Sequence, residues 1–281
     1  MTAAATTVAQ ALADARAAGL DRIDREVLMS ALLQRPRSWL LIHDDHVLSE
    51  SELARWTGWC ARRATGVPVA YLTGWHGFHG LDLQVTPAVL DPRPDTETLV
   101  DWALALLAEC AGQAPTVLDL GTGSGAIALA LQHRHPAARL IAVDRSEAAL
   151  AVARDNGRRL GLAVDWRLGS WFEPLAGQRV DLIVSNPPYI RADDPHLAAL
   201  RHEPLEALVA GEDGLADLRA LIAGAPDHLH DGGWLLLEHG HDQADAVAGL
   251  FAAGGWQAIG HRLDLGGHRR CTGACWRRVP G

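Results

Sequence analysis

Apolar residues recur at helical spacing in the first part of the chain, over residues 8–19 and again over residues 24–33. Ser49, with Glu52 three residues later, has the pattern of a capping box, in which the two residues satisfy each other's backbone N–H groups at a helix start. We therefore predict a third helix that begins after Ser49 and ends near Ala64, and an N-terminal segment made only of helices.

A different pattern follows over residues 71–90. Gly74, Gly77 and Gly80 separate short pieces of sequence, and apolar and polar residues alternate over residues 81–85 with the period of a strand. This combination is typical of a β-hairpin. Such a hairpin would connect the helical segment to the rest of the chain.

From residue 95 onward, helix-like segments alternate with apolar, strand-like runs. The predicted strands cover residues 116–120, 139–144, 163–167, 180–185, 233–238, 256–259 and 274–279. The predicted helices cover residues 95–107, 126–132, 146–160 and 243–252. This alternation predicts an α/β fold, with a doubly wound, mainly parallel, seven-stranded sheet and helices on both of its faces. No full helix separates the last two strands, so we expect a terminal hairpin with one antiparallel strand.

The chain is thus predicted to have three parts: a helical domain at residues 1–70, a hairpin connector at residues 71–90 and an α/β domain at residues 91–281. A length of 281 residues is sufficient for this arrangement. The helical domain contains no cluster of catalytic residue types, so we expect it to dock a substrate. A form of the protein that starts near residue 86 should then retain the ligand site of the α/β domain.

Composition narrows the range of partners and compartments. The net charge is −9 at pH 7, and all 25 basic residues are arginines. Proteins that coat nucleic acid are usually basic, so we expect no direct nucleic-acid partner. No apolar run has the length of a transmembrane helix, and residues 1–10 lack the basic and apolar regions of a secretory signal. We therefore expect a cytoplasmic protein that does not bind membranes.

The cysteines point to neither a disulfide framework nor a metal site. The chain contains four of them, which are Cys60, Cys110, Cys271 and Cys275. Four cysteines in a chain of this length are too sparse for a disulfide framework. Cys271 and Cys275 lie near His268, but zinc ligands usually show a tighter, paired spacing. We expect reduced thiols and no bound metal.

A glycine-rich loop follows the predicted strand at residues 116–120. Glycines let the backbone turn sharply and let a ligand approach closely, and the helix behind the loop offers free N–H groups. Asp119, near the end of the strand, is expected to face a cationic amino acid. Asp144, at the end of the next strand, can accept hydrogen bonds from both ribose hydroxyls of a nucleoside. The loop residues are Gly121, Thr122, Gly123, Ser124 and Gly125.

The same loop formally matches the dinucleotide fingerprint G-x-G-x-x-G/A, with Ala126 at the last position, so NAD is a rival ligand. Asp119 favours a different ligand, because a carboxylate at that point suits a cationic amino acid better than a pyrophosphate. An acidic strand end followed by G-x-G-x-G resembles the S-adenosylmethionine-binding fold. We therefore expect S-adenosyl-L-methionine as the cofactor.

The strand at residues 180–185 is followed by Asn186, Pro187, Pro188 and Tyr189. The carboxyl ends of parallel strands meet at one edge of the sheet, so these residues should lie beside the glycine-rich loop. The prolines lack N–H donors but keep their carbonyl acceptors, and Asn186 adds a side-chain carbonyl. Such a patch suits a planar NH₂ group stacked on Tyr189. The fixed acceptors favour the positive charge that develops on the nitrogen as it attacks a methyl group, and no dedicated base is required.

These residues resemble the Asn-Pro-Pro-Tyr motif of the S-adenosylmethionine-dependent amino methyltransferases. Further blocks are similar, in the same order, to those of the release-factor glutamine methyltransferases (the HemK/PrmC family), and the similarity extends from about residue 20 to residue 275. The blocks are residues 71–74, 92–97, 119–125, 171–172, 185–189, 203–208 and 235–240.

The resemblance implies a class I, Rossmann-like methyltransferase fold that follows a small N-terminal helical domain. It implies transfer of a methyl group to the side-chain amide nitrogen of the glutamine in the Gly-Gly-Gln loop of peptide chain release factors. Residues 121–125, Asp144 and Trp171 would contact the cofactor, with Trp171 near the adenine. Residues 186–189 would hold the glutamine, and Asn186 would also contact the cofactor.

Two positions depart from the family pattern. Ser170 stands where relatives often have aspartate, which weakens a polar contact near the adenine, and Asp91 stands where an aliphatic residue is usual. Methylation of a ribosomal-protein glutamine is an alternative, but residues 94–97 favour the release factor. A DNA or RNA adenine methyltransferase is another alternative, although the chain lacks a dense basic region. The intact motif at residues 186–189 argues against a non-catalytic binding module. We expect the enzyme to be a monomer.

Overall fold

The computed structural model describes residues 5–109 and 114–278. The chain divides into two compact units, Met1–Trp75 and His76–Gly281. The first unit is helical, as its sequence pattern predicts. Its helices are α1 (Val8–Ala17), α2 (Arg22–Leu33), α3 (Arg37–Leu40), α4 (Glu50–Ala64) and α5 (Val69–Thr73).

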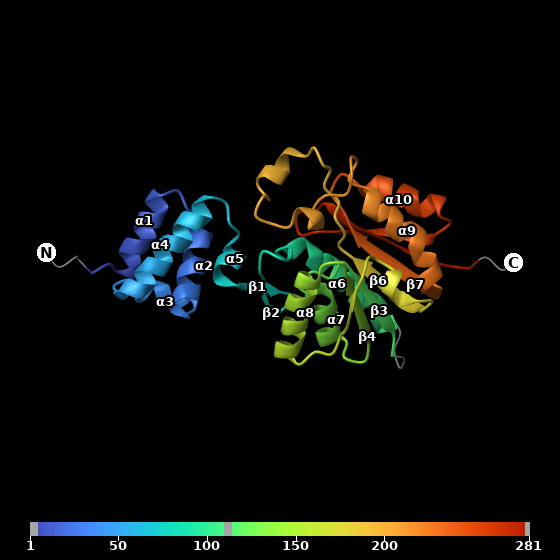
Figure 1. The fold of residues 1–281 in the computed structure, drawn as a ribbon, viewed down its shortest axis with the longest axis horizontal. Helices are drawn as coiled ribbons and strands as arrows, with labels where there is room; N and C mark the ends of the chain where they lie inside the picture. Colours follow the sequence, from blue (N-terminus) through green and yellow to red (C-terminus); the bar gives the residue numbers. More distant parts are fainter. Residues whose placement is uncertain (1–4, 110–113, 279–281) are drawn as a thin grey trace. The chain divides into compact units, whose positions relative to one another are not determined.

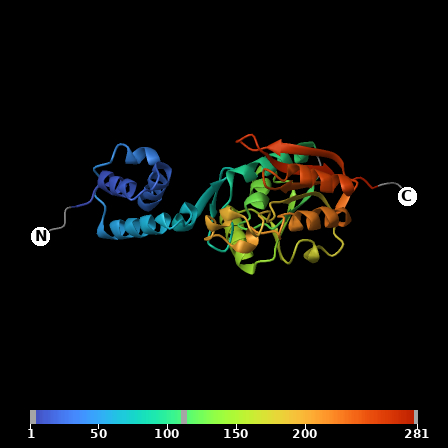
Figure 2. The ribbon, with the colours of Figure 1, turned by 90° about the horizontal axis from the view of Figure 1, so that it is seen from above.

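The first unit has a small core of its own. Helix α2 packs against both α1 and α4 (Figures 1 and 2), and Val8, Leu28 and Trp56 from these three helices are buried. The predicted capping box at the start of α4 is confirmed. The Glu52 N–H donates to the Ser49 hydroxyl at 3.3 Å, and the Ser49 N–H donates to the Glu52 carboxylate at 2.8 Å. This helix start is therefore fixed by local sequence alone.

The predicted hairpin forms within residues 71–90. Its strands are β1 (Trp75–Phe78) and β2 (Leu81–Gln84). Leu81 and Leu83 are buried and alternate with exposed residues, as the strand period predicts. Residues 71–73 belong instead to the short helix α5, which ends at Gly74 with φ of 82°. The hairpin is thus shorter than the sequence indicates.

The second unit contains the seven-stranded sheet, with the order β5-β4-β3-β6-β7-β9-β8. Among its described strands, β9 runs opposite to the rest and pairs antiparallel with both β7 and β8, which confirms the predicted terminal hairpin. The strands are β3 (Thr116–Leu120), β4 (Arg139–Asp144), β5 (Asp165–Leu168), β6 (Val180–Ser185), β7 (Leu229–Glu238), β8 (Gln257–Leu263) and β9 (Arg269–Cys275). The doubly wound, mainly parallel α/β fold is confirmed.

Some elements differ from the sequence prediction. Strand β9 starts five residues before the predicted 274–279, because the chain reverses at Gly267 and the buried Cys271 and Thr272 extend into the sheet. Residue 279 lies outside the described residues. Strand β5 lies slightly later than predicted, and β7 begins earlier. Helix α9 (Ala216–His228), which the sequence interpretation omits, precedes β7.

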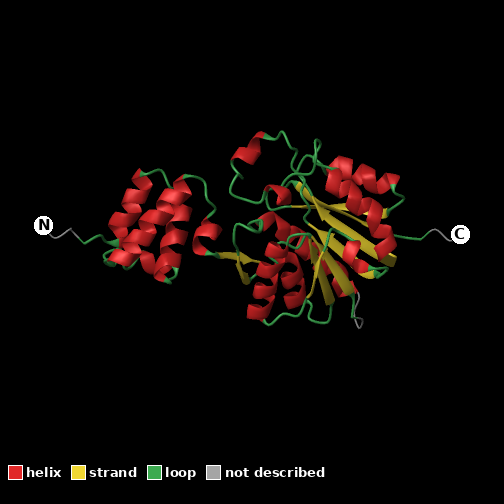
Figure 3. Cartoon of the chain, in the orientation of Figure 1, coloured by secondary structure: helices red, strands yellow, loops and turns green. Residues whose placement is uncertain are grey.

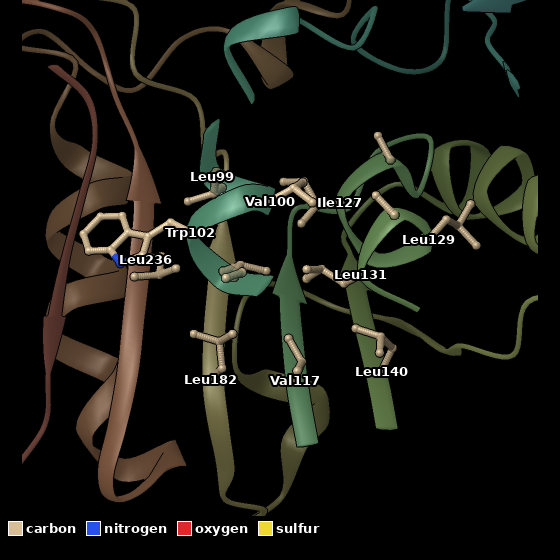
Figure 4. Packing of buried hydrophobic residues seen from close by; sticks show 14 of the residues in the cluster. Leu99, Val100, Trp102, Val117, Ile127, Leu129, Leu131, Leu140, Leu182 and Leu236 are labelled. Carbon is tan, nitrogen blue, oxygen red and sulfur yellow. The ribbon is translucent and has the colours of Figure 1, made fainter. Parts of the chain in front are cut away.

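Helices cover both faces of the sheet (Figures 1 and 3). On one face lie α6 (Glu97–Glu109), α7 (Ala126–Arg134) and α8 (Glu147–Leu160), and on the other lie α9 and α10 (Ala244–Ala253). Figure 4 shows the first face, where side chains of α6 and α7 pack on Val117, Leu140, Leu182 and Leu236 of the strands. The two layers hold the carboxyl ends of β3, β4 and β6 in fixed positions, and the site is built at those ends.

Candidate active site

The carboxyl ends of β3 and β6 lie side by side at the centre of the sheet. Leu120 and Ser185, the last residues of these strands, are register partners, and the Ser185 hydroxyl donates to the Leu120 carbonyl at 2.6 Å. Because β4 lies on the other side of β3, the order of strands reverses here. Open α/β sheets bind ligands in the crevice at such a reversal. The glycine-rich loop and Asn186 both start from this point, as the sequence predicts.

The glycines of the loop are required by its backbone path. Gly121, Gly123 and Gly125 all have positive φ, which side chains with a Cβ rarely adopt. At Gly125 a Cβ would also lie 3.0 Å from the ring of Trp166 and 3.1 Å from Leu129. The start of α7 can therefore pack close to β5 only with glycine at this position.

Asp119 supports the loop from inside the protein. It is fully buried, and its Oδ2 accepts hydrogen bonds from the Thr122 hydroxyl at 2.6 Å and the Ala128 N–H at 3.2 Å. Burial raises the pKa of Asp119 to about 7. Among the described residues, no partner contacts its Oδ1 by a hydrogen bond. This free acceptor is compatible with the predicted cationic amino acid, which stays a prediction.

Asp144 lies at the end of β4, against the loop. The Gly123 N–H donates to its Oδ2 at 2.8 Å, and the Ser146 N–H donates to its Oδ1 at 2.9 Å. Burial raises the pKa of Asp144 despite these bonds. Each oxygen keeps a lone pair for a ligand, since a carboxylate accepts about four hydrogen bonds. The carboxylate is thus oriented by the loop that it helps to shape.

A cleft of about 710 Å³ opens at the loop, and we call it the first cleft. Of the residues that the sequence predicts for the site, the cleft is lined by Gly121, Gly123, Asp144, Trp171, Asn186 and Pro188. Asp119, Thr122, Ser124 and Gly125 are buried, and they are not part of its lining. Ser170, one of the two positions that depart from the family pattern, also lines the cleft.

Trp171 is held in an uncommon backbone conformation. Its φ is 46°, in the left-handed region that residues other than glycine seldom adopt. Trp171 interacts with the Asp217 carboxylate at the start of α9 and opposes the rise in the pKa of Asp217 that burial causes. The Trp171 ring lies against Gly121, and a Cβ added at Gly121 would be 3.4 Å from this ring. Strain of this kind is frequent at ligand sites, and here it places an indole in the wall of the first cleft.

A second cavity of about 680 Å³ adjoins the first cleft, and Leu90, Asn186 and Ala207 line both. Pro187 and Tyr189 line only the second cavity, while Pro188 lines only the first cleft. The four-residue motif therefore separates two spaces. A group in the second cavity and a cofactor in the first cleft would meet at Asn186.

The side chains of the motif are anchored by residues that sequence reasoning did not select. The Asn186 Nδ2 donates to the Thr96 hydroxyl at 3.1 Å. The Tyr189 hydroxyl donates to Glu238 Oε1 at 3.2 Å. Thr96 and Glu238 both fall in sequence blocks that carry the family resemblance, and this is the one signal that pointed to them.

The unusual Asp91 belongs to an ionic cluster beside the second cavity. Its carboxylate contacts His76 Nδ1 at 2.7 Å and Arg93 at 3.8 Å. Arg93 in turn pairs with the buried Glu203, and both of these line the second cavity. Because His76 and Arg93 surround it, Asp91 is accommodated where an aliphatic residue is usual.

No three His, Cys, Asp or Glu side chains in the described part of the chain are arranged to hold a metal ion. Cys60, Cys271 and Cys275 are free thiols, and Cys110 lies outside the described residues. His239 is buried, and its Nε2 lies 2.7 Å from the Thr272 hydroxyl. Burial lowers the pKa of His239 to about 4, so it is neutral at pH 7. Its place is in the interior between β7 and β9.

Comparison with known proteins places this geometry in a family. Residues 96–203 match the family described as methyltransferase small domain, and residues 4–74 match the PrmC N-terminal domain. A release factor glutamine methyltransferase of Pseudomonas aeruginosa is 48% identical over 258 residues, which cover 91% of this chain and 92% of the relative. The corresponding protein of Bordetella pertussis is also 48% identical, over 91% of this chain and 95% of its own. The chain belongs to the release factor glutamine methyltransferase family.

Solved structures agree on the fold of this methyltransferase. A 16S rRNA methyltransferase of T. thermophilus, solved with AdoMet and guanosine, has a TM-score of 0.54 at 19% identity. The match covers 73% of this chain and 50% of that one. The similarity supports the class I methyltransferase fold. None of the helices in the described ranges has both the length and the apolar character needed to cross a membrane.

Proposed function

We propose that this enzyme transfers a methyl group from S-adenosylmethionine to the side-chain amide nitrogen of the glutamine in the Gly-Gly-Gln loop of a peptide chain release factor. The observation that carries the proposal is the position of Asn186, which lines both the first cleft and the second cavity, in a chain of this family. A release factor acts in the cytoplasm, so we also assign the enzyme to that compartment.

The first cleft fits S-adenosylmethionine in several respects. Asp144 offers carboxylate lone pairs to ribose hydroxyls, and Trp171 offers a flat ring to the adenine. Asp119 lies behind the loop and outside the lining of the first cleft, and its Oδ1, which has no hydrogen-bond partner among the described residues, is an acceptor of the kind that an ammonium group requires. Gly121 and Gly123 present backbone without side chains. The residues present therefore suit a nucleoside joined to an amino acid.

The chemistry required of the protein is positioning and charge stabilisation. When bound, S-adenosylmethionine supplies a methyl group on a positively charged sulfur, which is an activated leaving group. Asn186 Oδ1 and the Pro187 carbonyl would accept the two N–H bonds of the glutamine amide, and Tyr189 would hold its plane. An amide nitrogen is a poor nucleophile because its lone pair is delocalised. Fixed acceptors stabilise the positive charge that develops on the nitrogen, and the fixed orientation supplies much of the remaining rate gain. The nitrogen–methyl bond would form as the sulfur–methyl bond breaks, which leaves a neutral thioether, and the nitrogen would release one proton to solvent.

The proposal is tested with a purified, unmethylated release factor and isotopically labelled S-adenosylmethionine. We expect one labelled methyl group per molecule, on the Gly-Gly-Gln peptide, by mass spectrometry of the digest. A release factor whose loop glutamine is changed to glutamate serves as the control and should stay unlabelled. Labelling of ribosomal proteins or of adenine in nucleic acid, with none on the release factor, would replace the proposal by one of those activities.

Asp144→Ala should weaken S-adenosylmethionine binding by about 1.5–3 kcal/mol, because hydrogen bonds to a charged acceptor are lost. This loss corresponds to roughly 10-fold to 150-fold in Kd by calorimetry. Asp155→Ala, which removes an exposed carboxylate from α8, is the matched control and should leave Kd unchanged. Tight binding of NAD together with no binding of S-adenosylmethionine would contradict the assignment of the first cleft.

A further inference from the structure

A line of buried polar groups runs behind Asn186. Thr96 ends the short 3-10 helix η1 (Pro94–Thr96), and Glu238 ends strand β7. Their exposed fractions are only 4% and 1%. Asn186 donates to Thr96, Thr96 is hydrogen-bonded to Glu238, and Tyr189 donates to the same carboxylate. Two members of the Asn-Pro-Pro-Tyr motif are thus joined through one interior carboxylate.

The chemistry of these groups fixes which atom donates and which accepts at each hydrogen bond along the line. An ionised carboxylate only accepts hydrogen bonds, so the Thr96 hydroxyl must donate its single hydrogen to Glu238. Thr96 then has only lone pairs left for Asn186. The amide of Asn186 must therefore turn its NH₂ towards Thr96, and this agrees with the Nδ2–Oγ1 distance of 3.1 Å. Its Oδ1 is left as the amide atom available to a ligand.

We propose that Glu238, acting through Thr96, is a positioning residue that holds Asn186 with its carbonyl oxygen presented to the substrate amide. This proposal rests on the proposed function, because an oriented acceptor matters only if the substrate brings an NH₂ group. An amide in the opposite orientation presents its own NH₂ to that group, and two donors then face each other. The ionised Glu238 excludes the opposite orientation.

Protonation of Glu238 would remove the constraint on the orientation of the Asn186 amide. A protonated carboxyl can donate to Thr96, which frees the Thr96 hydroxyl to donate to Asn186 Oδ1 and lets the amide turn over. Burial raises the pKa of Glu238 to about 7, and the hydrogen bond with Thr96 and the positive charge of Arg270 oppose this rise. Activity should therefore be lost as the pH falls through about 7. The titratable and charged groups near Glu238 include Tyr189 after β6, Asp95 in η1, Arg270 and Cys271 in β9, and the buried His239, which is the next residue in the chain.

Two of these neighbours do not titrate in the relevant range. Burial raises the pKa of the Tyr189 phenol, so it stays a donor to Glu238, and burial raises the pKa of the Cys271 thiol, so it stays neutral. Asp119 would titrate in the same pH range as Glu238, since burial also raises its pKa to about 7. It lies in the loop of the first cleft, so the rate has to be measured with the cofactor saturating.

The first arm of the test compares Thr96→Val with Thr96→Ser. Valine keeps the shape of the side chain and removes its hydroxyl, whereas serine keeps the hydroxyl. With full-length enzyme, saturating cofactor and an intact release factor, we expect Thr96→Val to lower kcat by about 10-fold to 100-fold, as loss of orientation by a supporting residue commonly does. Thr96→Ser should restore kcat to within about threefold. The Kd for S-adenosylmethionine should change by less than about twofold in both, since Thr96 does not line the first cleft.

The second arm is a pH profile. Wild-type kcat should rise through an apparent pKa near 7, the value for Glu238. Glu238→Gln cannot ionise, so its profile should be flat across this limb, while Asp119→Asn should keep the limb. Unimpaired kcat in Thr96→Val, or a limb that persists in Glu238→Gln, overturns the proposal. If wild-type enzyme transfers no methyl group to the release factor, the proposed function fails and this proposal fails with it. Failure in the variants alone leaves the proposed function standing.

Discussion

Replacing Asn186 with alanine should lower single-turnover methyl transfer to a release factor by roughly 10²–10³, in line with the loss of one preorganised group from an active site. Asn186→Ala removes the acceptor at the point where the first cleft and the second cavity meet. It leaves a substrate N–H unpaired in a partly dry site, which costs about 1–3 kcal/mol by itself. Cofactor binding should fall much less, because Gly121, Gly123 and Asp144 remain.

The matched variant is Asn186→Asp, which keeps one acceptor and loses the donor to Thr96. Thr96 has a single hydrogen, which cannot serve both this new carboxylate and Glu238. We expect a transfer rate between those of wild-type enzyme and Asn186→Ala. Calorimetry on the same samples reports the Kd for S-adenosylmethionine. Near-normal transfer by Asn186→Ala would show that the glutamine is held elsewhere, and the proposed mechanism would be wrong.

Strands β3, β4 and β6, which are largely buried, were predictable from sequence to the residue. The runs at β3, β4 and β6 are continuous, apolar and bounded by glycine or polar residues, so their ends could be located. Those ends define the crevice, and the motifs that follow them fall beside it. This is why the sequence alone predicts that the glycine-rich loop, Asp144 and Asn186 lie together.

Elements with a mixed pattern were not predictable in the same way. Strand β9 opens with Arg269 and Arg270, which conceal its start, because charged residues are uncommon in an interior strand. Helix α9 contains Pro226 near its end, which counts against a helix in a sequence pattern. Its buried face, which includes Leu218 and Leu221, becomes evident only against the sheet.

The buried line behind Asn186 was beyond sequence reasoning for a further reason. Thr96 and Asn186 are 90 residues apart, and Tyr189 and Glu238 are 49 residues apart. Thr96 and Glu238 fall in blocks that carry the family resemblance, but the sequence pattern assigns no individual role to either residue. Only the topology, which places the ends of β6 and β7 side by side, brings them within hydrogen-bonding distance.

Removal of the first unit should separate cofactor binding from turnover on the intact substrate. We propose that the first unit, which matches the PrmC N-terminal domain, docks the release factor. The sequence favours a cut near residue 86, but that cut would remove Phe78, Leu81 and Leu83, which are buried in the core of the second unit. A form consisting of residues 76–281 keeps this core. We expect it to bind S-adenosylmethionine with a Kd within about threefold of the full chain, since its first cleft is intact.

On intact release factor, kcat/KM of the shortened form should fall by at least about 10²-fold, which corresponds to ~2.7 kcal/mol of lost transition-state stabilisation. A short peptide that contains Gly-Gly-Gln lacks the rest of the release factor, to which the first unit would bind. Both forms should therefore methylate the peptide with a similar, low kcat/KM. The peptide therefore separates docking from damage to the active site. If the shortened form is slower on the peptide to the same degree, the first unit supports the chemistry rather than docking. If it methylates intact release factor as fast as the full chain, the first unit has no docking role, and recognition of the substrate lies entirely in residues 76–281.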